Sequence, residues 1–174
     1  IVLKKASKKM IKELEKFKLS KINGIIEFPK LGFKELETIV NKIKKLNGGL
    51  LLIDYGFLKQ KKISTLQSIK LQKKNRIFDN MGKADITSLV NFSLLREFLS
   101  KNKLTLNKIV SQSFFLKRLG IIKRAEILGT KMNFKDKSDL YFRLERLLHP
   151  KHMGSLFKVI FAYKLKKKFL LGFK

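Results

Sequence analysis

The stretch Gly48-Gly-Leu-Leu-Leu-Ile-Asp-Tyr-Gly56 decides the fold of this chain. Its apolar run, residues 50–53, is short and lies between glycines, which predicts a strand buried on both faces of a parallel sheet. The preceding residues 34–46 carry a helical apolar pattern, and Gly48 stands where a helix usually ends. Asp54 and Tyr55 follow the run, at the end of the strand where α/β sheets bind ligands.

The composition is that of one globular domain. A length of 174 residues with 44% hydrophobic content allows a real core and excludes a disordered polycation. The chain has no cysteine, which excludes disulfides and thiolate metal sites. Its two histidines, His149 and His152, are too few for a zinc site without carboxylates, so we expect no metal. We also expect no membrane span and no signal peptide.

The charge is strongly positive, but its pattern does not favour a specific nucleic-acid site. Lys and Arg number 41 against 13 Asp and Glu, a net charge of +28. Six are Arg, which leaves 41 − 6 = 35 Lys spread along the chain. Phosphate and base recognition favours Arg forks, whereas Lys in place of Arg is typical of drift in an AT-rich genome. We therefore expect only weak, salt-sensitive binding to polyanions, and a basic nucleic-acid binder stays an alternative.

The order of apolar patterns predicts an α/β architecture with an inserted hairpin and closing antiparallel strands. Residues 1–24 form a basic lead-in, a helix or the remnant of a truncated half; residues 25–164 form the main portion, and 165–174 a loose basic tail. We expect strands at 25–28, 50–53, 65–70, 104–110 and 156–163, and helices at 31–46, 88–100, 112–119, 123–132 and 137–148. Residues 73–83 are predicted as a loop and 153–154 as a turn. This is the second half of an α/β sheet, because no glycine-rich loop follows a strand.

An ordered set of motifs along the chain resembles the MidA family of class I S-adenosylmethionine (SAM)-dependent methyltransferases. The set comprises the 48–56 stretch, Thr65-Leu66-Gln67, Gly-Lys-Ala-Asp-Ile-Thr-Ser-Leu-Val-Asn-Phe at 82–92, Ser111-Gln112, Leu119-Gly120-Ile121 and Met-Gly-Ser-Leu-Phe-Lys-Val at 153–159. The resemblance covers residues 25–163. It implies a Rossmann-like sheet of seven strands, SAM as cofactor, and methylation of a protein arginine on a respiratory complex I subunit.

The chain also departs from the family pattern. The glycine-rich SAM loop and the family's Asn-Glu motif are not present, so we predict no cofactor-binding residue here and a C-terminal part that is inactive alone. Lys83 replaces the usual Glu, Leu89 the usual His and Asn91 the usual Asp. A guanidinium needs acidic partners, so these departures weaken arginine binding. The alternative is a non-catalytic module that binds a respiratory subunit. The expected compartment is the bacterial cytoplasm, with the mitochondrial matrix as alternative.

Two candidate substrate-binding residues, Asp54 and Tyr55, come from the decisive stretch. Asp54 could orient a cationic substrate or cap the next turn, and the resemblance makes these roles equally weighted. Tyr55 could cover a pocket, although packing in the core is the commoner role for such a residue.

Four further candidates lie in the later motifs. Gln67 and Gln112 could bind substrate, but satisfying loop backbone is the favoured role. Asp85 and Thr87 have the character of caps for the helix predicted at 88–100, which does not exclude a substrate contact.

Overall fold

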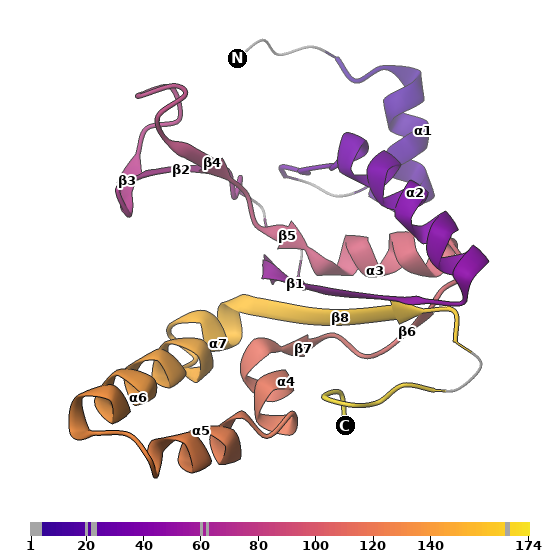
Figure 1. Cartoon of the computed structure of the whole chain (residues 1–174). Coiled ribbons are helices and arrows are strands. Elements are labelled where there is room, and N and C mark those ends of the chain that lie inside the picture. The colour runs from indigo at the N-terminus through magenta and orange to yellow at the C-terminus, as the bar shows by residue number, and fades with distance from the viewer. Residues whose placement is uncertain (1–4, 20, 22–23, 60, 62, 166–167) are drawn as a thin grey trace.

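The computed structural model describes residues 5–19, 21, 24–59, 61, 63–165 and 168–174 (Figure 1). Its elements are α1 (Lys8–Lys16), α2 (Lys30–Leu46), β1 (Gly49–Phe57), β2 (Gln67–Lys70), β3 (Lys73–Asn75), β4 (Asp85–Thr87), β5 (Val90–Asn91), α3 (Phe92–Lys101), β6 (Thr105–Leu106), β7 (Val110–Ser111), α4 (Gln112–Arg118), α5 (Ile121–Gly129), α6 (Phe134–Leu148), α7 (Met153–Leu156) and β8 (Phe157–Tyr163).

The strands form two sheets. The larger has the order β5-β1-β8-β6, with β7 also paired to β8, and the smaller has the order β3-β2-β4. β1 runs antiparallel to β8 from Gly49, opposite Tyr163, to Tyr55, opposite Phe157. Beyond that, β1 pairs in parallel with β5 at Gly56 and Phe57. The small sheet projects from one end of the molecule, and β5 leads the chain back from it (Figure 1).

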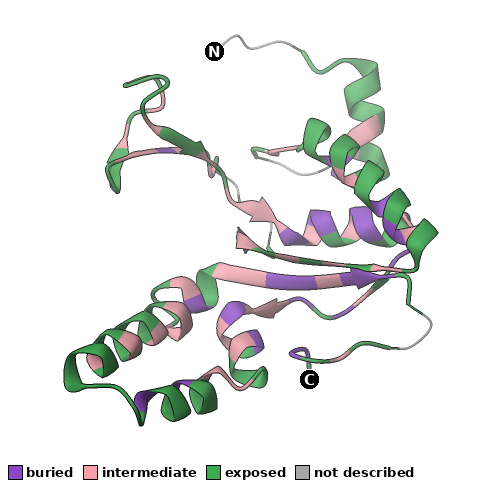
Figure 2. Cartoon of the chain, viewed as in Figure 1, coloured by how far each residue is buried: buried purple, intermediate pink, exposed green. Residues whose placement is uncertain are grey.

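β8, and not β1, is the strand buried on both faces. Ile160 and Ala162 belong to a core formed with α2 and α3, whereas Val159 belongs to a second core with Phe115 of α4. Figure 2 shows β8 mostly buried between these two groups of elements. The prediction that residues 50–53 lie buried in a parallel sheet was therefore wrong. Leu50 and Leu52 of β1 pack on the first core, whereas Leu51 and Ile53 are each 44% exposed.

The first core gathers four phenylalanines from distant parts of the chain. Phe33 of α2 stacks on Phe98 of α3, with ring centroids 4.3 Å apart, and also contacts Phe17 and Phe28. The left-handed Asn47 ends α2 and turns the chain into β1. The predicted 31–46 helix is confirmed as α2. Of the two alternatives for the lead-in, the helix is present as α1, and Phe17 at its end packs against this core.

Several local predictions need correction. Residues 25–28 are not a strand in the structure, and the predicted 73–83 loop contains β3. The predicted 104–110 strand is divided into β6 and β7, and the predicted 153–154 turn opens α7. The described part of the tail is not loose, because Phe173 is buried against Phe115 and Asn107 donates to the Phe169 carbonyl at 2.7 Å. Residues 166 and 167 lie outside the described residues. No helix in the described ranges is long and apolar enough to cross a membrane.

Candidate functional site

The strand predicted at residues 50–53 extends to Phe57, so Asp54 and Tyr55 lie within β1 and not after it. As successive residues of a strand, their side chains point to opposite faces of the sheet. Asp54 Oδ1 accepts a hydrogen bond from the Tyr55 backbone N–H at 2.8 Å. The Tyr55 ring meets Phe157 of β8 edge to face, with centroids 5.6 Å apart. Both candidates are half-buried. This contact is not the predicted cap of the next turn, because its donor is the adjacent residue of the same strand. The half-exposed carboxylate is still accessible to a ligand.

A lysine faces this carboxylate across the sheet. Lys158 of β8 stands opposite Asp54, and on its other side opposite Ser111 of β7. Burial lowers the pKa of the Lys158 ammonium. The ammonium donates to the carbonyl of Ser155 in α7. The end of the large sheet therefore carries a row of polar residues, Asp54, Lys158 and Ser111.

Three candidates lie together on the small sheet instead. Gln67 Nε2 of β2 donates to Thr87 Oγ1 of β4 at 3.2 Å, and the two residues are cross-strand partners. Asp85 is exposed on β4 and stands opposite Ile69. Gln67 therefore satisfies a side chain and not the backbone. The structure places these three residues on one sheet and does not bring them next to Asp54 and Tyr55 of β1.

Gln112 has the structural role predicted for it. Its buried side chain donates from Nε2 to the Leu147 carbonyl at 3.0 Å, which ties α4 to α6. The residue before it, Ser111, caps α4 by accepting from the Phe114 N–H at 3.2 Å.

Asp85 and Thr87 are not caps, which corrects the second role predicted for them. Helix α3 begins at Phe92, and Asn91 caps it by accepting from the Leu94 N–H at 3.1 Å. The helix starts later than predicted because Val90 and Asn91 pair with β1 before it begins. The departure from the family pattern at Asn91 thus retains a side chain that can cap a helix.

The sequence interpretation missed Glu27. Its carboxylate accepts from Ser64 Oγ at 2.8 Å and from the N–H groups of Thr65 at 2.7 Å and Leu66 at 3.1 Å. Its second oxygen accepts from Thr65 Oγ1 at 2.5 Å. Burial raises the pKa of this carboxyl, but the hydrogen bonds from residues 64–66 outweigh burial and lower it. The one signal in the sequence is a lone carboxylate within the apolar Ile-Ile-Glu-Phe at 25–28.

Two hollows lie beside the 64–66 loop that Glu27 binds. A cavity of about 520 Å³ lies between the 27–36 segment and the start of α3, and its walls include Glu27, Leu66, Leu89 and Asn91. A more open groove of about 890 Å³ runs under the small sheet, lined among others by Gln67, Leu66 and Leu89. Two positions that depart from the family pattern, Leu89 and Asn91, therefore line the first cavity, whereas Lys83 is exposed.

The glycine-rich turn expected of a cofactor loop is not found at the parallel strand pair in the described part of the chain. The parallel pair in this part of the chain is β1 with β5, and β5 runs directly into α3 with an asparagine at the cap and no glycine-rich turn. Nor does any cluster of three or more His, Asp or Glu side chains among the described residues suit a metal ion.

Comparisons with known proteins place the chain in a family. Residues 2–110 match a family model described as "Putative S-adenosyl-L-methionine-dependent methyltransferase". A Burkholderia thailandensis protein described as a candidate methyltransferase, bound to S-adenosyl-homocysteine, shares the fold with a TM-score of 0.73, at 21% identity over 95% of this chain and 44% of its own. A second Burkholderia thailandensis structure, described as that of an uncharacterized protein, has a TM-score of 0.64, at 25% identity over 77% of this chain and 39% of its own.

Curated relatives are called protein arginine methyltransferase NDUFAF7, mitochondrial. The Danio rerio protein is 28% identical over 71% of this chain, and the Homo sapiens protein 30% identical over 70%. The chain covers only 29% and 27% of their lengths. The predicted Rossmann-like α/β class is confirmed by the solved structures. Since the family model matches well over half of it, the chain belongs to the MidA family of SAM-dependent methyltransferases.

Proposed function

We propose that this chain is the substrate-side part of a SAM-dependent protein arginine methyltransferase, and that it transfers a methyl group only together with a SAM-binding part. Family membership and the names of the curated relatives support the reaction. The proposed substrate is an arginine of a respiratory complex I subunit, by resemblance to the MidA family. The mitochondrial relatives support the matrix as the alternative compartment to the bacterial cytoplasm.

One edge of β1 is largely unpaired, and this observation supports the proposal of a separate SAM-binding part. β8 occupies one edge of β1 from Gly49 to Tyr55, and β5 occupies the other edge only at Gly56 and Phe57. Among the described residues, no strand pairs with the rest of that second edge. Exposed Leu51 and Ile53 lie on the same stretch. An unpaired apolar strand edge readily accepts another strand, which favours an incomplete sheet over a self-sufficient interaction module.

The carboxylates of this chain would hold the acceptor. Asp54 is half-buried within β1, and a carboxylate there can pair with a guanidinium, align it and accept its proton as the methyl group arrives. Holding the two reactants in line supplies much of the acceleration of such a displacement. SAM supplies the methyl group. Tyr55, Gln67, Asp85 and Thr87 remain candidate substrate contacts. Gln112 is the weakest of the set, because its amide is committed to α6.

Complementation tests this function. The 174-residue chain is mixed with the part of the Burkholderia protein that it does not cover, then with SAM and purified complex I subunits, and methylarginine is measured by mass spectrometry. We expect no product from the chain alone and methylarginine from the mixture. Methylation by the chain alone would contradict the two-part proposal. A mixture that binds S-adenosyl-homocysteine but yields no methylarginine would contradict the arginine assignment.

A variant pair tests the site. We expect Asp54→Asn to lower methyl transfer at least about tenfold, since it removes a charged partner of the guanidinium. Asp139→Asn, at an exposed position on α6, should leave the rate unchanged. Equal rates for both variants would remove Asp54 from the site.

A further inference from the structure

We propose that Glu27 is a positioning residue, which holds the 64–66 loop and the turn at Leu89 in place as walls of the substrate cavity. The inference rests on the proposed function for the identity of the substrate. The contact itself is a property of the chain alone: a carboxylate that accepts four hydrogen bonds from residues up to 39 positions away.

The geometry assigns Glu27 to positioning and not to substrate binding. One carboxylate oxygen accepts from Ser64 Oγ and from the N–H groups of Thr65 and Leu66, and the other accepts from Thr65 Oγ1. Carboxylate oxygens offer about four acceptor sites in all. A guanidinium could pair bidentately with this group only by displacing the loop, because one oxygen already accepts three bonds. Charge-assisted bonds are about twice as strong as neutral ones, so their number indicates a firmly held loop.

Thr65 extends the hold to a third segment. Its hydroxyl donates to Glu27 and in turn accepts from the Leu89 N–H at 2.9 Å, across 24 residues of sequence. The hydroxyl therefore has a fixed direction, and Glu27 determines it. The small sheet lies between residues 65 and 89, so this relay fastens both of its connections to the body of the protein.

The held residues form the walls of both hollows. Leu66 and Leu89 line the cavity of about 520 Å³ and also the groove of about 890 Å³. Gln67 and Thr87, two of the substrate candidates, each lie within two residues of the anchored Thr65 and Leu89. A shift of the loop would therefore alter where a bound substrate peptide lies, without moving the Asp54 carboxylate of β1.

In the described part of the chain, one charged side chain lines a hollow together with Glu27. Lys61 shares a small hollow with it, together with Phe57 and Leu89, and its ammonium lies 5.5 Å from the centre of the Phe57 ring. The groups that donate to Glu27 are hydroxyls and backbone amides, none of which titrates near neutral pH. The hold should therefore depend on the ionisation of Glu27 itself.

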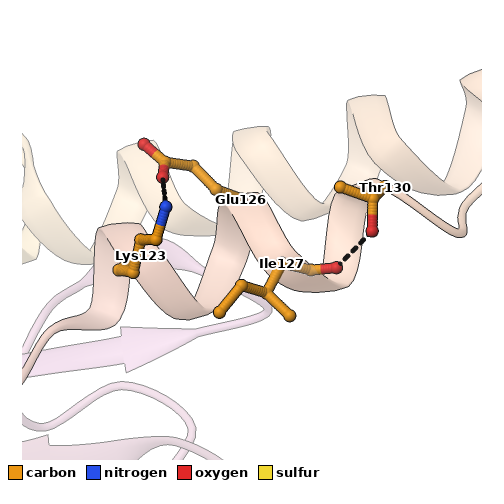
Figure 3. Close-up of polar contacts among 4 residues, drawn as sticks. All are labelled: Lys123, Glu126, Ile127 and Thr130. Atoms are coloured by element: carbon orange, nitrogen blue, oxygen red, sulfur yellow. Dashed lines mark hydrogen bonds and ion pairs between the residues drawn. The ribbon is translucent and has the colours of Figure 1, made fainter.

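Amide hydrogen exchange on the whole chain tests the hold. We expect Glu27→Ala to lower the protection of the Thr65, Leu66 and Leu89 amides by about tenfold. Thr65 and Leu66 lose their bonds to the carboxylate, and the Thr65 hydroxyl that accepts from Leu89 is no longer held in one direction. Thr65→Val should lower protection at Leu89 and leave Leu66 protected. The matched control is Glu126→Gln on α5, where an exposed Glu126–Lys123 pair at 3.3 Å stabilises little (Figure 3).

The KM and kcat of the complemented enzyme distinguish a residue that positions the substrate cavity from one that only stabilises the fold. We expect Glu27→Ala to raise the KM for the peptide about tenfold with kcat nearly unchanged, and Glu27→Gln, which keeps one oxygen acceptor, to recover most of the loss. Unaltered protection in Glu27→Ala would overturn the proposal. So would lost protection with unchanged KM. If the wild-type mixture never methylates arginine, the proposed function fails, and amide exchange alone decides whether Glu27 holds the loop.

Discussion

β1 and β8 are neighbouring antiparallel strands of similar apolar content, yet they occupy different environments. β8 has β1 on one edge and β6 and β7 on the other, with a core on each face. β1 has one covered face and an edge that is largely unpaired among the described residues. An apolar run therefore predicts a strand, whereas its neighbours decide how deeply that strand is buried.

Truncating one apolar side chain in each strand should give the largest difference in stability between β8 and β1. Ile160 of β8 is fully buried, so Ile160→Ala should lower the free energy of unfolding by about 2–5 kcal/mol through lost contacts and a cavity. Leu51→Ala in β1 should cost less than about 1 kcal/mol, because nearly half of that side chain is already in water. Urea denaturation of both variants measures the difference. Similar losses would mean that β1 is as enclosed as β8.

The junction of β1 with β5 offers the next contrast. A Cβ atom on Gly56 would lie 2.2 Å from the Val90 carbonyl oxygen, so Gly56→Ala must push the two strands apart and should cost about 1–3 kcal/mol. Gly48, just before β1, has no atom within 4 Å of such a Cβ. Gly48→Ala is the matched control and should be nearly neutral in the same denaturation experiment. A neutral Gly56→Ala would show that the parallel pairing is not tight.

Lowering the pH should loosen the 64–66 loop, which Glu27 binds, before it affects β8. The pKa of Glu27 is lower in the folded chain than in the unfolded one, so its contribution is present above the unfolded value and is lost as pH falls through the folded value. Amide protection at Thr65 and Leu66 should fall in that window, after correction for intrinsic exchange, while protection in β8 persists. Glu27→Gln should abolish this local pH dependence, and persistence of it in that variant would assign it to another group.

A charge on the open edge should have the smallest effect on the chain alone. Leu51→Lys should change the free energy of unfolding by no more than about 0.5 kcal/mol, because the side chain lies at an exposed position. It should nevertheless prevent complementation, since a lysine there opposes addition of a strand. Lys45→Leu at the end of α2 is a control for a change of charge and apolar area elsewhere. Unimpaired methyl transfer by Leu51→Lys would place the SAM-binding part on another surface.

Periodicity located most elements because it reflects local geometry. The apolar spacing of residues 31–46 agrees with α2 to within one residue, and the 156–163 run agrees equally well with β8. The two-residue strands β5, β6 and β7 were missed or merged, since pairing with a distant strand defines them and no period fits so short a segment. The candidate site shows the same limit of local patterns. Asp54 lies within β1 and not after it, because the strand continues to Phe57, and Gln67 and Thr87 proved to be each other's partners.

The sequence by itself determined the α/β class, the family and the presence of a strand at the apolar run 50–53, because each depends on residues close together in the chain. Only the tertiary structure decided that β8 is the central strand, that Asn91 caps α3, and that Glu27 fastens a loop 37 to 39 residues away. Strand order and long-range hydrogen bonds depend on which segments contact each other in the folded chain. Such contacts leave no local pattern in the sequence of either segment.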